Sequence, residues 1–322
     1  QILIARRYGE RNFGAIGGIF DNSFYFLGIT SIVLTLLLFF SGSSILKVIV
    51  SSDAVYQASA TYLKFRIPGL FFATVGLLFR AFYTGVNYTR YLSLSSAIMA
   101  GINVLLDYLL IFGKGGFPEM GIAGAAIASS ISEACALIFL FAITVRNSRV
   151  KPYKLFSWVK PEWEIVKSTL GISVFIMIQF VLSLSVWFVF FLIIEKMGER
   201  PLAVSNIIRS VYMFLMIPGW ALCSVTNTPV SNVLGEGRPE QVMPITWKII
   251  RYSILILLGV IVVSALFPRA ILSIYTNNQG LIEASVPSFY VVLLALFLFS
   301  LTSILFNAVL GTANTKVTLL IE

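Results

Sequence analysis

The chain has 322 residues, of which 58% are apolar and only 11% are charged, and its formal net charge is +9. A soluble domain of this length cannot bury so much apolar surface, so the composition predicts an integral membrane protein. The positive charge does not indicate nucleic-acid binding, because the lysines and arginines lie in short gaps between apolar runs and do not cluster on one water-facing element.

Apolar runs long enough to cross a bilayer, which takes about 20 residues, follow one another along the chain. They are apolar on nearly all faces and lack the alternation of transmembrane strands, so we expect an all-α fold. The two longest runs are expected to be tilted or bent, with Pro218 as the candidate kink. The predicted spans are 19–42, 63–87, 91–113, 121–145, 165–194, 202–232, 249–268 and 286–312, the two longest being 165–194 and 202–232.

Lysines and arginines in the gaps predict the orientation of these spans. They are more numerous on the side that holds the start of the chain and segment 146–164, which places that side in the cytoplasm. Segment 146–164 is charged and contains two prolines, so we interpret it as a cytoplasmic linker. It separates a predicted N-terminal lobe, residues 1–145, from a predicted C-terminal lobe, residues 165–322.

The chain contains an internal repeat at a constant offset of 226 residues. YGE at 8–10 aligns with LGE at 234–236, and ILKVI at 45–49 aligns with ILSIY at 271–275. An even number of spans separates the copies, which predicts a parallel repeat with a two-fold axis along the membrane normal. Several segments have no counterpart in the other copy. We therefore expect a parent protein of about twelve helices, six per lobe, covered here from the end of helix 2 to the start of helix 11.

Several motifs within or next to these spans resemble one family of transporters. They are IARRYGERN (4–12), RIPGLFF (66–72), NVLLDYLLIFGKGGFPEMGIAGAAIAS (103–129), LAVSNIIRSVYMFLMIPGW (202–220) and SNVLGEG (231–237). They resemble the multidrug and toxic compound extrusion (MATE) family, and the resemblance extends over essentially the whole chain. The resemblance implies a V-shaped pair of six-helix lobes that exports organic, often cationic compounds in exchange for Na⁺ or H⁺.

The resemblance also implies a coupling site in the N-terminal lobe. In one branch of the family this site uses an Asp of helix 1, an Asn and an Asp one turn apart on helix 5, and a hydroxyl residue on helix 6. Asn103 and Asp107 match the helix-5 pair, and Ser129 stands where the hydroxyl residue is found, whereas we expect helix 1 to precede the given sequence. Another branch has acids in helices 7 and 10, but neither 169–193 nor 288–310 contains Asp or Glu, so that second site is not expected.

The same residues stand out on physical grounds. A carboxylate deep in a helix bundle is costly unless it is paired, hydrated or neutralised, so Asp107 is a functional candidate. It shares a helix face with Asn103, and Ser129 and Glu133 have the same four-residue spacing on the next, antiparallel helix. Their oxygens suit Na⁺, but the carboxylate could instead take up a proton. The alternative role for Asp107 and for Glu133 is a hydrogen bond between helices.

The C-terminal lobe carries a second set of polar residues inside predicted spans. Gln179, Ser183 and Trp187 follow at four-residue spacing on one helix, and Asn206 and Arg209 lie on a stripe of the next. We predict that they form a polar wall of the substrate cavity, where Trp187 offers a ring face to a cation. The alternative is that they only join neighbouring helices.

The predicted function is therefore a cation-coupled antiporter that exports amphipathic, cationic organic compounds by alternating access between two lobes. We expect a monomeric, multi-pass protein of the inner (plasma) membrane, with the lipid bilayer and a small organic substrate as partners and no nucleic acid. No cofactor is expected apart from the coupling ion, Na⁺ or H⁺, with Na⁺ bound at Asp107, Asn103 and Ser129.

Three other functions compete with this one. A flippase of the same superfamily that moves a lipid-linked saccharide would favour several cavity arginines, of which Arg209 is one. A membrane enzyme is disfavoured because the chain has no histidine and few intramembrane acids. A channel is disfavoured because a two-lobe repeat suits rocking better than a fixed pore.

Overall fold

The computed structural model describes residues 1–50, 52–158 and 160–322, so residue 159 of the predicted linker lies outside the described residues. Every regular element among the described residues is helical, in agreement with the predicted fold class. In chain order the elements are α1 Ile2–Gly9, α2 Phe13–Ile49, α3 Asp53–Gly85, α4 Arg90–Ile111, α5 Gly121–Arg146, η1 Lys151–Tyr153, α6 Trp163–Lys196, α7 Glu199–Leu215, α8 Ile217–Gly235, η2 Pro239–Gln241, α9 Val242–Leu266, α10 Pro268–Ser273, α11 Gln279–Gly311 and α12 Thr315–Ile321.

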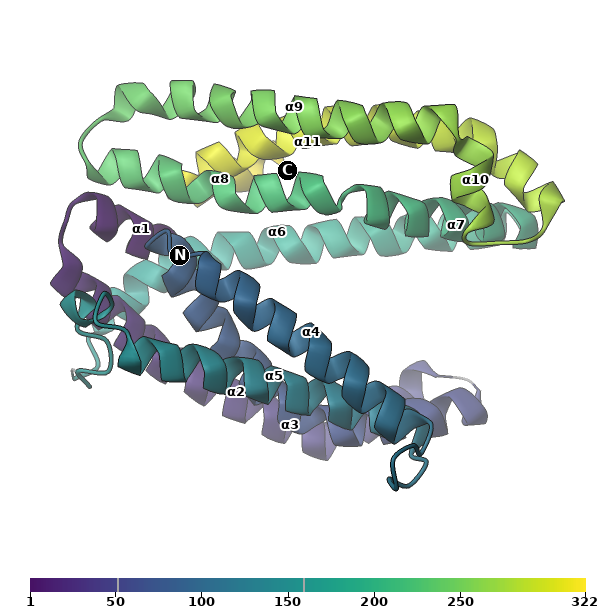
Figure 1. Cartoon of the computed structure of the whole chain (residues 1–322), viewed down its shortest axis with the longest axis horizontal. Helices are drawn as coiled ribbons and strands as arrows, with labels where there is room; N and C mark the ends of the chain where they lie inside the picture. The colour runs from purple at the N-terminus through teal and green to yellow at the C-terminus, as the bar shows by residue number, and fades with distance from the viewer. Residues whose placement is uncertain (51, 159) are drawn as a thin grey trace. The chain divides into compact units, whose positions relative to one another are not determined.

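Contacts between these elements divide the chain into two compact units (Figure 1). The N-terminal unit comprises residue 1 and residues 11–167, and the C-terminal unit comprises residues 2–10 and 168–322. The described residues of the predicted linker, 146–164, thus all belong to the N-terminal unit. The short helix α1 belongs to the C-terminal unit, because it packs against α8.

Each predicted span corresponds to a long helix or helix pair. Among the described residues, seven helices are long and apolar enough to cross a membrane, and α7 and α8 are so only when taken together, with a bend of 51° between them. The longest single helix is α2, with 37 residues, and not one of the two predicted longest spans. A helix continues past its apolar run because backbone hydrogen bonding does not require apolar side chains, so the run alone underestimates its length.

The bend between α7 and α8 lies next to the predicted kink. The break falls at Met216, and Pro218 occupies the first turn of α8. A proline is tolerated there because the N–H that it lacks would have no partner within the helix, whereas its ring would disturb a helix running through the preceding turn. The prediction of a bend in this span is therefore confirmed, while α6 runs without a break over 34 residues.

In the N-terminal unit, α5 packs against both α3 and α4, and α2 packs against α3. The contacting faces of α5 are rich in small buried residues, including Ala126, Ala128 and Ser132. Small side chains let membrane helices approach closely, which is the main source of packing energy between helices in lipid. This packing places one face of α4 directly against α5.

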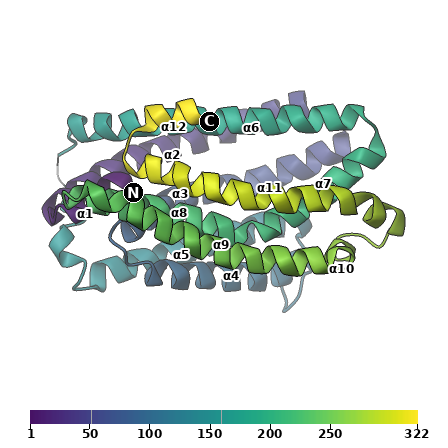
Figure 2. The same ribbon diagram turned by 90° about the horizontal axis from the view of Figure 1, so that it is seen from above.

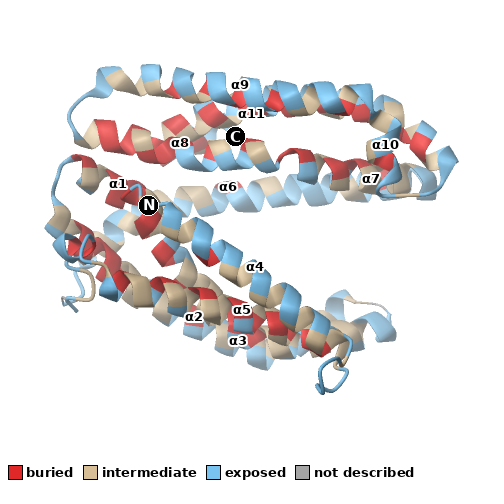
Figure 3. Cartoon of the chain, in the orientation of Figure 1, coloured by how far each residue is buried: buried red, intermediate tan, exposed pale blue. Residues whose placement is uncertain are grey.

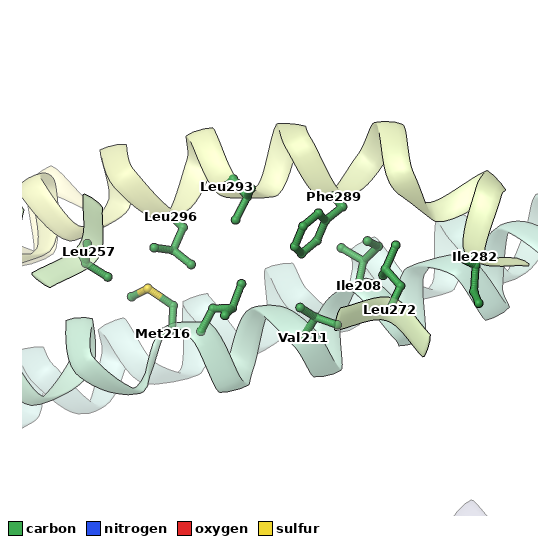
Figure 4. Packing of buried hydrophobic residues seen from close by; sticks show 10 residues of the cluster. Ile208, Val211, Met216, Leu257, Leu272, Ile282, Phe289, Leu293 and Leu296 are labelled. Atoms are coloured by element: carbon green, nitrogen blue, oxygen red, sulfur yellow. The ribbon is translucent and has the colours of Figure 1, made fainter. Parts of the chain in front are cut away.

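The core of the C-terminal unit forms where α7, α9, α10 and α11 meet (Figure 4). Met216, Leu257, Phe289 and Leu296 are almost completely buried in it. By contrast, α6 is exposed along most of its length (Figure 3). The short helix α12 lies beside α6 (Figure 2), and there the Nζ atom of Lys316 is 5.9 Å from the ring centroid of Phe175.

Candidate functional site

The polar faces of α4 and α5 meet in the middle of both helices. The Nδ2 atom of Asn103 in α4 donates a hydrogen bond of 3.4 Å to the Oγ atom of Ser129 in α5. Both residues are half-buried. The structure thus brings together two of the residues that the sequence proposed as ligands, and the carbonyl oxygen of Asn103 stays available as an acceptor.

Asp107 lies one helical turn from Asn103 on α4. Its Oδ1 atom is buried and has no hydrogen-bond partner among the described residues. A buried polar atom without a partner is costly, so a cation or a proton bound at this oxygen would be stabilising. The set of a carboxylate, an amide carbonyl and a hydroxyl consists of hard oxygen ligands, so these side chains fit a small cation such as Na⁺ in their chemistry.

Glu133, the fourth residue proposed for the coupling site, has a different partner. Its two carboxylate oxygens accept hydrogen bonds of 2.7 and 2.6 Å from the guanidinium of Arg66 in α3. Two parallel bonds of this kind fix both side chains and compensate both charges within the helix bundle. Sequence reasoning missed Arg66 as a partner because it lies 67 residues from Glu133, although it opens the quoted motif RIPGLFF.

The predicted polar wall of the second lobe falls on α6 and α7. The Arg209 guanidinium lies 4.7 Å from the ring centroid of Phe191, and Trp187 stacks on the same ring at 6.1 Å. Gln179 is buried, and its Nε2 atom has no partner among the described residues. The structure therefore joins Trp187 and Arg209 through Phe191, a residue that the sequence analysis did not select.

The other two residues of this predicted wall make different contacts. Ser183 is half-buried and donates a hydrogen bond to the Glu322 carboxylate. The backbone carbonyl of Asn206 accepts a bond of 2.9 Å from Ser210 within α7. Neither contact joins these two residues to Arg209.

A second polar cluster, also missed from the sequence, anchors the linker to α2. The Asp21 carboxylate accepts a 3.0 Å hydrogen bond from the amide of Phe156, and the side-chain oxygen of Asn22 accepts one of 2.7 Å from the amide of Glu162. A Cβ atom at Gly17 would lie 2.4 Å from the Tyr153 carbonyl oxygen. The only available signal was the pair Asp-Asn at the start of an apolar run, which does not reveal a partner so distant in sequence.

Comparison with known proteins gives the family of the chain. A model of the MatE family matches residues 1–109 and 176–322, which is well over half of the chain. The chain belongs to the MATE family of membrane transporters. The resemblance seen in the sequence motifs is thereby confirmed.

Individual MATE relatives agree with this assignment. The chain is 27% identical over 316 residues to a protein of Thermotoga maritima called "Probable multidrug resistance protein NorM", and this match covers 98% of the chain and 67% of the relative. It is 26% identical to a protein of the same name from Brucella suis, with 66% of the chain and 44% of the relative covered. The chain thus matches only part of the length of these MATE proteins.

Solved structures of MATE transporters have the same fold. One of them, described as the outward-facing conformation of a multidrug resistance MATE family transporter of the MOP superfamily, has a TM-score of 0.90 and 19% sequence identity. The match covers 99% of this chain and 70% of that chain. At 19% identity, the structural similarity shows only that this chain has the same fold.

Proposed function

We propose that the protein of which this chain is part is a cation-coupled antiporter that exports amphipathic, cationic organic compounds by alternating access. Membership of the MATE family supports transport, and the relatives named as multidrug resistance proteins support organic compounds as the substrate class. We place the protein in the plasma membrane as a monomer, with the linker and the N-terminal end of the chain in the cytoplasm.

The observation that carries the coupling site is the buried Oδ1 atom of Asp107, which has no partner among the described residues. It lies one turn from the contact between Asn103 and Ser129. A bound Na⁺ or proton would neutralise this carboxylate and remove the cost of the unpaired oxygen. Such binding drives transport only if the ion binds one conformation more tightly than the other.

The ion pair with Arg66 sets Glu133 apart from this site. Because its carboxylate is already compensated by a guanidinium, Glu133 has less to gain from a cation than Asp107 has. We therefore assign ion coupling to Asp107, Asn103 and Ser129, and we assign Glu133 to the packing of α3 against α5.

We assign substrate contact in the second unit to the group formed by Trp187, Phe191 and Arg209. Trp187 is 48% exposed, so its indole ring can offer a face to a cationic substrate. Arg209 already lies over the ring of Phe191, and one such guanidinium is weak support for a phosphate-binding flippase cavity.

The test uses the full-length protein in proteoliposomes with an imposed Na⁺ or H⁺ gradient. Asp107→Asn keeps the size of the side chain but removes the charge, so we expect ion-driven export to be lost. Glu240→Gln serves as the matched control, because Glu240 is exposed in the short helix η2. Undiminished export by Asp107→Asn would exclude the proposed site, and binding of the organic substrate in both variants shows that the protein is folded.

A further inference from the structure

A groove with a volume of about 400 Å³ lies where α4 begins and α5 ends. Neither the coupling site nor the residues proposed for substrate contact take part in it. Its walls combine an apolar surface with a polar rim. The lining residues are Tyr91, Phe139, Ala142, Ile143, Arg146 and Asn147.

The polar rim is held in place before any ligand binds. Asn147 accepts a 3.0 Å hydrogen bond from the amide of Arg149 through its side-chain oxygen, and its Nδ2 atom donates a 3.0 Å bond to the hydroxyl of Tyr91. Tyr91 also packs against the ring of Tyr83, with centroids 5.4 Å apart. Because the Tyr91 hydroxyl accepts in this bond, its own hydrogen remains available for donation to a ligand.

The charge around the groove favours an anion. Arg146 is exposed and has no ion-pair partner among the described residues. The flanking segments 85–106 and 134–161 contain no Asp or Glu, but besides Arg146 they carry Arg90, Arg149 and three lysines. A guanidinium next to a hydroxyl donor is the combination that proteins use to bind phosphate oxygens.

The position of the groove distinguishes a lipid from a free phosphate ion. Arg146 and Asn147 mark the end of α5, where the apolar helix leaves the membrane. Ile143 and Phe139 lie about one and two turns further into the span, on the same wall of the groove. A ligand that fills it must therefore present an anionic group at the membrane boundary and an apolar chain below it.

We propose that this groove binds an anionic phospholipid. The phosphate accepts hydrogen bonds from the Arg146 guanidinium and the Tyr91 hydroxyl, and an acyl chain lies against Phe139, Ala142 and Ile143. The proposal concerns the surface of the N-terminal unit alone and does not depend on which compound is exported.

The first test measures binding to the purified full-length protein in detergent by native mass spectrometry and by thermal unfolding. The probes are dioleoyl phosphatidylglycerol, dioleoyl phosphatidylcholine with the same chains, and inorganic phosphate. We expect phosphatidylglycerol to bind and to raise the unfolding temperature more than the other two. Arg146→Gln should weaken its binding about fivefold, which is the usual effect of one basic residue near an anionic membrane.

Two further variants sharpen the result. Arg146→Lys keeps the positive charge and should retain most of the binding, whereas Arg149→Gln removes an exposed charge that does not line the groove and should weaken binding much less than Arg146→Gln does. Three outcomes would overturn the proposal. The two glutamine variants could weaken binding equally, the two lipids could bind equally well, or inorganic phosphate could raise the unfolding temperature as much as phosphatidylglycerol does.

A photo-crosslinking experiment identifies the occupant directly. Phe139→p-benzoylphenylalanine places a reactive group on the groove wall of the full-length protein in membranes that contain phosphatidylglycerol. A phospholipid adduct at this position supports the proposal. A crosslink to another segment of the protein or to a second copy would show that protein fills the groove, and would reject a lipid site.

Discussion

Gly9 in α1 and Gly235 in α8 lie at equivalent positions of the internal repeat, and each packs against the backbone of the other's helix. A Cβ atom at Gly9 would lie 2.0 Å from the backbone oxygen of Asn232, and one at Gly235 would lie 2.2 Å from that of Arg6. Arg6 and Asn232 are themselves 226 residues apart. The contact between the two helices is therefore two-fold symmetric, as a parallel repeat predicts.

This symmetric contact leads to a prediction about stability. Gly235→Ala should destabilise the protein by about 1–3 kcal/mol, because the neighbour is backbone and the two helices must move apart to admit a methyl group. The measurement is the thermal unfolding of the purified full-length protein. Gly259→Ala is the control, since nothing lies within 4 Å of a Cβ atom at that position in α9, and it should be neutral or stabilising. Equal effects of the two variants would contradict the predicted clash.

The ion pair between Arg66 and Glu133 leads to a second prediction. Their side chains are 27% and 20% exposed, so removing one charge leaves the other largely buried, and Glu133→Gln should cost about 2 kcal/mol. The double variant Arg66→Gln with Glu133→Gln should be less destabilised than the sum of the single variants. Thermal unfolding of the four proteins measures the coupling, and strict additivity would argue against a direct pair.

The same double variant tests the assignment of Glu133. If Glu133 only packs α3 against α5, the folded double variant should retain ion-dependent export, with Asp107 still present. Export that no longer responds to the ion gradient would return Glu133 to the coupling site.

The anchoring of the linker on α2 leads to a third prediction. Asp21 is 1% exposed and its carboxylate accepts the amide of Phe156. Asp21→Ala should accelerate hydrogen exchange at this amide about tenfold or more, because a hydrogen bond to a charged group contributes about 1.5–3 kcal/mol. Asp21→Asn keeps an acceptor oxygen and should have a smaller effect. Mass spectrometry measures the exchange rate. An unchanged rate in Asp21→Ala would show that other contacts hold the linker.

The proposed orientation leads to a fourth prediction. In a protein without Cys135 and Cys223, a membrane-impermeant maleimide should label Lys114→Cys in intact cells but should label Arg149→Cys only after the cells are permeabilised. Both positions are exposed, and they lie in the segments that precede and follow α5. The reverse pattern of labelling would place the linker outside the cell.

Much of the helix arrangement could be predicted from the sequence because each span is a local property. An apolar run of sufficient length specifies a helix without knowledge of its neighbours, and Pro218 acts on the turn that immediately precedes it. The same holds for Asn103 and Asp107, whose spacing on one helix places them on one face. The antiparallel neighbour α5 followed from a short loop, which is why Ser129 could be predicted near Asn103.

The hydrogen-bonding partners of the other polar residues depended on tertiary structure, since nothing local in the sequence determines which helices meet. The residue that neutralises Glu133 comes from α3, and the amides that Asp21 and Asn22 bind come from a segment more than 130 residues away. The sequence by itself determined that this is a helical membrane protein with a parallel repeat, because these features follow from composition and periodicity. Only the folded chain decided that Glu133 is paired while Asp107 keeps a buried oxygen without a partner, because that difference depends on which side chains the packing brings together.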